Sequence, residues 1–351
     1  MMKATIRILA LLLICGSMFF SCDKNKKAVE NDVENDVVEK AVFKNDEFKS
    51  IVATALNKPA DELTTDDLAV ITGLDIYFYA ERIENTSRYK EVCSVTLKKE
   101  GFDEVFEVYY NTPADEREGL KTPSDYSYNY QSETFEGYED IKLLTNLKTI
   151  SLSSEYQLIQ EDPVKYFSDI SGLEDVSIYN YVVEDLNEIS RLTELTNLNI
   201  GINLRSIPDG VKITYIEDLT PLKKLTKLTT LSLSGNFISD LSPLVSLPNL
   251  TELSINNAAL GDISPVAEMK NLTSVSFYYN GIEDVTPLSK LPKLEYIHLD
   301  YNYIKDLSPF RELDPNVVKY VSVDMNAFED TTPLKHLGKD KVNFGYDPYW
   351  E

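Results

Sequence analysis

Apolar residues and prolines repeat at a nearly constant spacing from residue 137 onward. Five prolines lie 22 residues apart and a sixth follows after 24 residues: Pro221, Pro243, Pro265, Pro287, Pro309 and Pro333. Nine pairs of apolar residues, each with one residue between its members, run through the same region: Ile150/Leu152, Val176/Ile178, Leu198/Ile200, Leu231/Leu233, Leu253/Ile255, Val275/Phe277, Ile297/Leu299, Val321/Val323 and Val342/Phe344. Such a pair predicts a short strand with both side chains on one face. The sequence therefore predicts nine copies of one unit.

Written out, the unit is LxxLxxLxLxxNxIxDLSPL. It resembles the leucine-rich repeat of bacterial internalin-like proteins, and the resemblance covers residues 136–345, about 60% of the chain. The resemblance implies an α/β solenoid with a curved parallel sheet on its concave side and short helical or 3-10 turns on its convex side. One unit cannot bury its apolar side alone, so the units must stack about 4.8 Å apart.

Residues 42–81 predict a helical N-terminal cap and a first strand. Apolar residues from Phe43 to Leu56 recur at helical spacing until Asn57 stops them. Thr64 to Asp67 resembles a capping box and predicts a second helix that ends at Gly73, before an alternating strand over 74–78. The resemblance to internalin-like proteins implies a cap of this kind ahead of the repeats.

Three segments interrupt or end this pattern. Residues 82–135 form an insertion in which 92–97 and 105–110 predict a hairpin, followed by a connection rich in tyrosine, serine and aspartate. Pro208 to Gly210 lies in an expansion between two repeats and predicts a protruding loop. Residues 346–351 form a C-terminal tail.

Residues 1–21 read as an export signal, with Lys3 and Arg7 ahead of an apolar run over 8–20. Ser21 and Cys22 resemble the end of a bacterial lipoprotein signal, although Phe19 stands where Leu is usual. The resemblance implies that Cys22 carries lipid and that the protein is exported, anchored in the bacterial cell envelope and exposed at its surface. Ordinary cleavage and an uncleaved anchor are the alternatives. Residues 22–41 are charged, lack aromatic residues and predict a flexible tether.

Charge and cysteine content narrow the class of partner. The formal net charge is −24, and loss of Lys3 and Arg7 with the signal leaves −26. Nucleic acid and anionic membrane surfaces are therefore poor partners. After cleavage before Cys22, Cys93 is the only other thiol, so no intramolecular disulfide framework can form. Cys93 shares one face of a predicted strand with Val95, which indicates a buried, inert thiol.

Two polar columns run along the repeats. An asparagine column is expected to pair backbone groups that stacking would bury: Asn203, Asn236, Asn280, Asn302 and Asn326, with Glu155, Tyr181 and Ala258 departing from it. An aspartate column stands three residues before each proline: Asp218, Asp240, Asp262, Asp284, Asp306 and Asp330. Each carboxylate is expected to cap a short helical turn. A calcium ladder is the alternative.

The residues beside each inward pair must point outward on the concave face of the sheet. The middle outward column is small and polar except at His298: Ser151, Ser177, Asn199, Ser232, Ser254, Ser276, His298 and Ser322. The candidate ligand-binding residues are this histidine and its surroundings: Ser276, Tyr278, Tyr279, Tyr296, His298, Asp300, Tyr301, Tyr320 and Ser322. Tyrosine suits recognition because it offers a large contact area with few torsions. Relief of crowding explains the small residues equally, and ordinary solvent-facing positions explain the tyrosines.

The chain carries no recognisable catalytic motif. Its two histidines, His298 and His336, lie outside any metalloprotease or nucleophile pattern, and no phosphate-binding loop is present. We therefore expect a non-enzymatic protein without metal or cofactor. The expected function is binding of a protein ligand on the concave face, and the resemblance to internalin-like proteins implies an adhesin or host-interaction role. The alternatives are an envelope assembly protein that uses 82–135 as its contact, and a glycan-binding protein whose tyrosines stack on sugars.

Overall fold

The computed structural model describes residues 39–82, 89–99, 106–111, 136–155, 158–204, 207 and 213–345. Several predicted features lie outside these residues: the signal, Cys22, most of the tether, most of the 82–135 insertion, the loop at 208–210 and the tail at 346–351. The side chain of Cys93 is likewise not described. No helix in the described part of the chain is long and apolar enough to cross a membrane.

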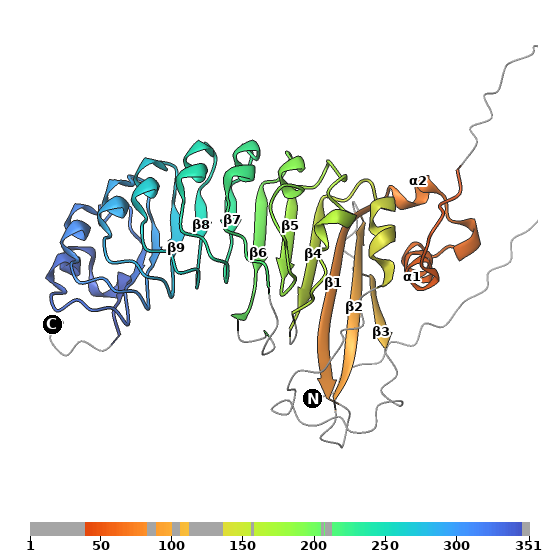
Figure 1. The fold of residues 1–351 in the computed structure, drawn as a ribbon, viewed down its shortest axis with the longest axis horizontal. Coiled ribbons are helices and arrows are strands. Elements are labelled where there is room, and N and C mark those ends of the chain that lie inside the picture. Colours follow the sequence, from red (N-terminus) through yellow and green to blue (C-terminus); the bar gives the residue numbers. More distant parts are fainter. Residues whose placement is uncertain are drawn as a thin grey trace, which may run out of the picture. The chain divides into compact units, whose positions relative to one another are not determined.

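The repeats form one open, curved sheet (Figure 1). Its strands are β1 (Ile71–Arg82), β2 (Tyr89–Lys99), β3 (Phe106–Asn111), β4 (Thr149–Ser154), β5 (Asp175–Tyr179), β6 (Asn197–Gly201), β7 (Thr230–Ser232), β8 (Glu252–Ser254), β9 (Ser274–Ser276), β10 (Tyr296–His298), β11 (Tyr320–Ser322) and β12 (Val342–Asn343). Their order in space is β12 back to β4, then β1, β2 and β3. Strand β1 and strands β4 to β12 are parallel, while β2 and β3 are antiparallel to their neighbours.

The parallel array begins one strand earlier than the nine predicted copies. Strand β1 pairs with β4 so that Leu74 lies opposite Ile150 and Ile76 opposite Leu152. Leu74 and Ile76 are fully buried and are therefore the inward pair of a tenth coil. Along its other edge β1 pairs with β2 over its whole length, and β2 pairs with β3. The described strands of the insertion thus extend the repeat sheet.

The cap holds helices α1 (Asp46–Leu56) and α2 (Thr65–Leu68). Asn45 begins α1 by accepting the N–H of Phe48 at 2.7 Å, and Asn57 ends it in the left-handed conformation at φ 54°. Thr64 and Asp67 bond reciprocally across the start of α2, which confirms the capping box.

The predicted end of the second helix was wrong. Helix α2 stops at Leu68, and Gly73 lies inside β1. A Cβ at Gly73 would stand only 2.7 Å from Thr149 Oγ1, so the close approach of β1 to its neighbour β4 requires glycine there. Glycine is needed at position 73 because two strands approach each other closely there, and not because a helix ends there.

Short 3-10 turns complete each coil on the convex side. They are η4 (Glu136–Leu143), η5 (Val164–Tyr166), η6 (Ile189–Arg191), η8 (Thr220–Lys224), η9 (Ser242–Ser246), η10 (Ser264–Glu268), η11 (Thr286–Lys290), η12 (Ser308–Glu312), η13 (Thr332–Leu337) and η14 (Lys339–Lys341). A further 3-10 turn, η1 (Ala60–Glu62), lies in the cap between α1 and α2. The repeating prolines stand at the first turn of η8 to η13, where a missing N–H costs nothing.

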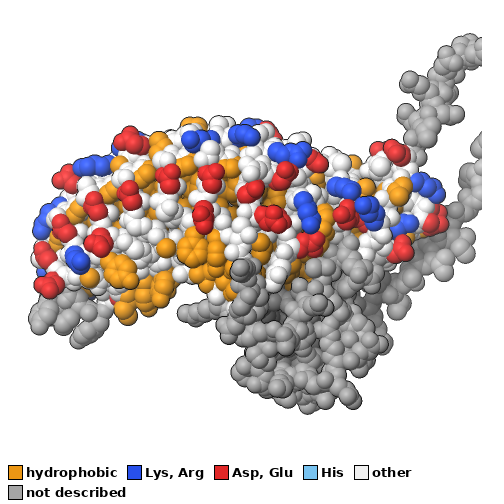
Figure 2. All heavy atoms as spheres, in the orientation of Figure 1, with side chains coloured by type: hydrophobic (Ala, Val, Ile, Leu, Met, Phe, Trp, Pro, Cys, Tyr) orange, Lys and Arg blue, Asp and Glu red, His pale blue; other side chains and the backbone are white. Residues whose placement is uncertain are grey.

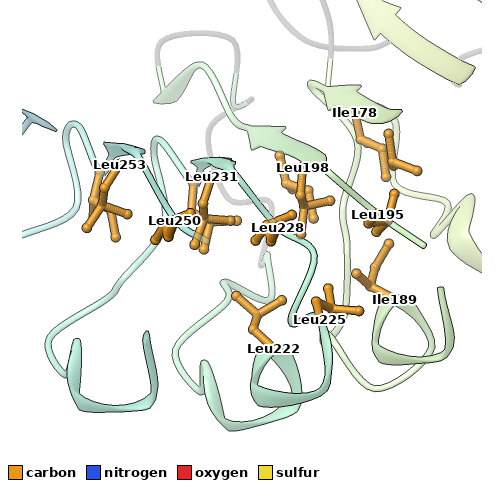
Figure 3. Close-up of a cluster of buried hydrophobic side chains, with 14 of the residues drawn as sticks. Ile178, Ile189, Leu195, Leu198, Leu222, Leu225, Leu228, Leu231, Leu250 and Leu253 are labelled. Carbon is orange, nitrogen blue, oxygen red and sulfur yellow. The ribbon is translucent and has the colours of Figure 1, made fainter. Parts of the chain in front are cut away.

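Leucine, isoleucine and valine side chains fill the space between the strands and the 3-10 turns. Leu231 and Leu253 point from their strands into the space between the strands and the 3-10 turns, and Leu222 and Leu225 lie on the other side of that space (Figure 3). All four are fully buried or nearly so. Each coil therefore completes its neighbour's core, as the repeat pattern requires.

Buried asparagines tie successive coils together. Asn302 Oδ1 accepts the N–H of Ile282 at 3.1 Å, and its Nδ2 donates to the carbonyl of Phe277 at 2.8 Å, both in the preceding coil. Its Nδ2 also lies 2.9 Å from the Leu299 carbonyl of its own coil. Asn280 and Asn326 repeat this arrangement, which confirms the predicted role of the column.

The column differs from its prediction in two coils. Asn180, which the pattern omitted, is completely buried and donates to the Ser154 carbonyl at 2.8 Å. Its Oδ1 accepts the N–H of Asn203 at 2.7 Å, so the side chain of Asn180 links its own coil to both neighbouring coils. Ala258 leaves its own coil without a bridging side chain, although Asn280 still accepts the Ala258 N–H at 3.1 Å.

Replacement of Asn302 tests this bridge. Because Asn302→Ala leaves several buried backbone groups without partners, we expect the free energy of unfolding to fall by about 2–4 kcal/mol. Urea unfolding followed by circular dichroism measures it. Asn316→Ala is the matched control, since Asn316 is exposed and its amide bonds only Asp314, and its effect should stay within about 0.5 kcal/mol. Equal losses in the two variants would contradict the bridging role.

Candidate functional site

The outward face of the sheet follows the predicted alternation around β9. Val275 and Phe277 are fully buried, whereas Ser276 between them is partly exposed. Ser276 donates to Asn256 Oδ1 at 2.9 Å, and the same oxygen accepts the N–H of Tyr278 at 2.8 Å. Asn256, which the sequence did not single out, therefore holds both residues in place.

Two predicted ligand-binding residues have structural roles instead. Ser322 is only 2% exposed, so the expectation that it faces a ligand was wrong. Its hydroxyl donates to Asp300 Oδ1 at 2.5 Å and accepts from Asn343 in the next coil at 2.9 Å. The same oxygen of Asp300 accepts the N–H of Asp324 at 2.7 Å. Both side chains hold the C-terminal coils in register.

The predicted tyrosines form two groups rather than one site around His298. The strand group consists of Tyr296, His298 and Tyr320; the His298 and Tyr320 ring centroids lie 5.3 Å apart, on adjacent strands. The turn group consists of Tyr278, Tyr279 and Tyr301, whose three ring pairs lie 5.3–5.9 Å apart. The turn group lies where the chain leaves β9 and β10.

One cation stands beside the strand group. Lys319 Nζ lies 5.6 Å from the ring centroid of Tyr296 and 2.5 Å from the carboxylate of Glu295. The hydrogen bond with Glu295 raises the pKa of Lys319, so its ammonium stays charged at neutral pH. A ligand on this face meets aromatic rings, an imidazole and a lysine that already has a partner.

Two tyrosines of the turn group occupy a conformation that disfavours large side chains. The fourth residue after each first inward residue is left-handed in five successive coils: Gly235, Asn257, Tyr279, Tyr301 and Met325, with φ between 51° and 75°. The turn requires this conformation because the N–H of Tyr279 then donates to the backbone carbonyl of Asp300 at 3.0 Å. In the same way, the N–H of Tyr301 donates to the backbone carbonyl of Asp324 at 3.0 Å. Glycine and asparagine tolerate it, while other residues lose about 1–2 kcal/mol.

Exposed aromatic side chains continue along the turns that follow the strands. We call this surface the turn edge and define it as residues 235–240, 257–262, 279–284, 301–306 and 325–330. Besides Tyr279 and Tyr301 of the turn group it presents Phe237, Tyr303 and Met325, each at least half exposed. Hydrophobic side chains gather along one edge of the repeats beside a row of acidic ones (Figure 2). The sequence analysis missed Phe237 and Tyr303, although both stand two residues after the left-handed position.

The aspartate column caps the 3-10 turns, as predicted. Each carboxylate accepts the N–H of the residue two positions later at 2.8–2.9 Å, in Asp218, Asp240, Asp262, Asp284, Asp306 and Asp330. Hydrogen bonds from Ser242 hold the pKa of Asp240 below its ordinary value, and Ser308 does the same for Asp306. Among the described residues, no three His, Cys, Asp or Glu side chains come together as a metal site.

The comparison with protein families decides what the coils are. A family model described as "Leucine Rich repeats (2 copies)" matches residues 226–268 and 270–312. Residues 226–268 and 270–312 therefore consist of leucine-rich repeats. A comparison of the chain with curated proteins gave no match.

Solved structures show which solenoid it is similar to. An internalin, InlF, from Listeria monocytogenes has a TM-score of 0.55 and 22% identity, over 86% of this chain and 76% of that one. Internalin C2 of the same organism has a TM-score of 0.47 and 21% identity, over 86% and 94%. A leucine-rich-repeat protein of Leptospira interrogans has 0.39 and 18%, over 59% and 68%. The likeness to InlF shows that this chain has the internalin fold.

The capping carboxylates predict how stability depends on pH. Hydrogen bonds lower the pKa of Asp218, Asp240, Asp306 and Asp330 in the folded state. Their stabilisation is therefore complete above the unfolded pKa near 3.8 and is lost as pH falls through the lower folded values. We expect a variant with all four aspartates changed to asparagine, which also caps, to melt nearly like the wild type at pH 7 and to lose less stability on acidification.

Thermal melts followed by circular dichroism from pH 7 to pH 3 measure this difference, with the wild type as reference. The same melts with added Ca²⁺ separate a capping role from an ion-binding role. Caps predict no change in melting temperature with Ca²⁺. A rise of several degrees in the wild type that the four-site variant lacks would show a calcium ladder instead.

Proposed function

We propose that this protein is an exported, lipid-anchored protein of the bacterial cell envelope whose C-terminal repeats bind a protein ligand. The left-handed tyrosines of the turn group carry the proposal. Tyr279 and Tyr301 stand where the preceding coils have Gly235 and Asn257, and both are more than 40% exposed. Neither gains the core burial that would offset the strained backbone, so recognition is the better explanation for a large side chain there.

The strand group supplies the concave part of the same surface. Tyr296 is 40% exposed on β10, and His298 and Tyr320 are partly exposed beside it. Rigid aromatic side chains on short, fully paired strands lose little conformational entropy on binding. The internalin-like fold supports the proposal of an adhesin or host-interaction protein, because it presents such a face on a rigid frame.

The strand group is tested by the double variant Tyr296→Ala with His298→Ala. Protein immobilised through its C-terminus recovers binding partners from outer-surface and host extracts, and biolayer interferometry measures the affinity of each purified partner. Truncation of two central side chains predicts at least a 100-fold weaker affinity. Tyr179→Ala is the matched control, because Tyr179 is 41% exposed on the same sheet but four strands away from β9, nearer the cap.

The control should bind within about twofold of the wild type, because surface truncations away from an interface leave affinity nearly unchanged. A correctly folded double variant with unaltered affinity would contradict binding through the strand group. A partner that binds only through residues 82–135 would support an assembly role instead, and binding confined to a glycan array would support glycan recognition.

Lipid attachment is tested in cells that express the full chain. We expect an alkyne-labelled fatty acid to be incorporated into the wild type and the protein to sediment with membranes, because two or three acyl chains anchor stably. Cys22→Ser should lose the label and leave the membrane fraction. Cys93→Ser is the control and should keep both. Retention of label in Cys22→Ser would exclude this cysteine as the lipidation site.

A further inference from the structure

The turn edge contains a notch that the proposed concave site does not use. A groove of about 380 Å³ is lined by residues of five turns: Leu204, Gly235, Asn236, Phe237, Asn257, Ala258, Ala259, Tyr279, Asn280, Gly281 and Tyr303. Its walls are Phe237 on one side and Tyr303 on the other, half exposed or more. Three coil spacings separate these walls along the solenoid, which is about 14 Å.

The floor of the notch is open because two successive coils carry small residues there. Ala259 and Gly281 occupy the column in which Phe237 and Tyr303 stand in the flanking coils. Ala259 is itself left-handed at φ 57°, a conformation that the equivalent residues of the flanking coils do not adopt. This backbone distortion lies at the centre of the notch, where strained residues often mark a binding site.

Two hydrogen-bonding groups in the floor have no partner among the described residues. The amide side chain of Asn257 is one, and the N–H of Ala259 is the other. By contrast, the N–H of Gly281 in the next coil donates to the Leu260 carbonyl at 2.8 Å. The notch thus combines aromatic walls with a few convergent polar groups, which is the usual make-up of a ligand site.

The charge around the notch is negative. The four turns of the turn edge that line the notch carry five carboxylates, Asp240, Asp262, Glu283, Asp284 and Asp306, against a single lysine, Lys305. Lys305 lies 4.0 Å from Glu283 and is partly neutralised by it. Among the residues that the structure describes, none that lines the groove is basic. Aromatic faces in a negative field attract cations.

We propose that the notch holds an arginine or lysine side chain from an extended segment of the protein partner. The cationic head stacks on Tyr303 or Phe237, and a backbone carbonyl of the segment accepts the N–H of Ala259. This proposal rests on the proposed function as a protein-binding surface but concerns the turn edge, so it adds a charge preference that the strand group alone does not impose.

The experiment uses the methyl groups of the notch floor as reporters. Protein labelled with ¹³C at alanine methyls is titrated with the capped pentapeptide Gly-Gly-Arg-Gly-Gly at millimolar concentration, and Ala259→Ser assigns the reporter signal. We expect the Ala259 methyl signal to shift on titration. Tyr303→Leu with Phe237→Leu keeps apolar walls but removes the aromatic faces, and should weaken the apparent affinity about tenfold.

Three controls test whether the response requires a cationic side chain and the aromatic walls. The same peptide with leucine or glutamate in place of arginine should shift the signal far less, and so should the disaccharides chitobiose and maltose. Tyr179→Leu should leave the arginine response unchanged. Equal responses to arginine and leucine, a response to sugars alone, or an arginine response that survives loss of both aromatic walls would each overturn the proposal.

The two proposals fail separately. Tyr296→Ala with His298→Ala alters only the strand group, so it should leave the arginine response of the notch intact. Loss of partner binding in that variant with a normal notch response would support the proposed function on its own. If the protein binds its partner but shows no response to the arginine peptide, only the proposal about the notch is contradicted.

Discussion

The hydrogen bonds of the buried asparagines are the interaction on which the remaining structure depends. Asn280, Asn302 and Asn326 each satisfy an N–H and a carbonyl of the preceding coil from a side chain that stacking has taken out of water. A buried backbone group without a partner would cost about 1–3 kcal/mol. The amide must therefore stand at one height in each coil that carries it, and this constrains the length of those coils.

A fixed spacing determines which positions remain variable. Inward residues must be aliphatic or aromatic to fill the shared core, and the aspartate before each 3-10 turn must accept its N–H. The turn that follows each of the strands β7 to β10 must be left-handed so that its N–H reaches the next coil. Only the outward strand positions and the tips of the turns are free, and there the aromatic residues of the C-terminal coils gather. The turn aromatics also strain the backbone, which separates them from residues needed for folding.

Most of the repeat architecture could be predicted because the same motif recurs in successive coils. The core pairs, the capping aspartates and the bridging asparagines were readable from their 22-residue period. The strand over 74–78 was predicted, but its place in the repeat array was not, because Leu74 and Ile76 occur without the rest of the motif and only pairing with β4 makes them part of the array. The bridging role of Asn180 was not predicted, because its coil has a different spacing. Its side chain therefore reaches the equivalent backbone groups from another sequence position.

The candidate site was less predictable than the fold. Sequence reasoning expected the tyrosines on the concave face, whereas Tyr279 and Tyr301 belong to the turns that follow the strands. It could not show that the next coil covers Ser322 or that the Ser322 hydroxyl holds Asp300. It also assumed one cluster, whereas the rings divide between strands and turns. Phe237 and Tyr303 form a notch only because Ala259 and Gly281 are small in the two coils between them, a relation in space across 66 residues.

Site-specific photo-cross-linking in living cells tests most directly whether these repeats are a protein-binding surface. A photoreactive phenylalanine analogue placed at Tyr279, Tyr296 or Tyr303 should capture one discrete partner of the same mass. The same analogue at Tyr179 on β5 or at Val245 on η9, both exposed, should capture none. Capture that is equal at all five positions, or absent at the first three while the protein is folded and exported, would contradict recognition by the C-terminal coils.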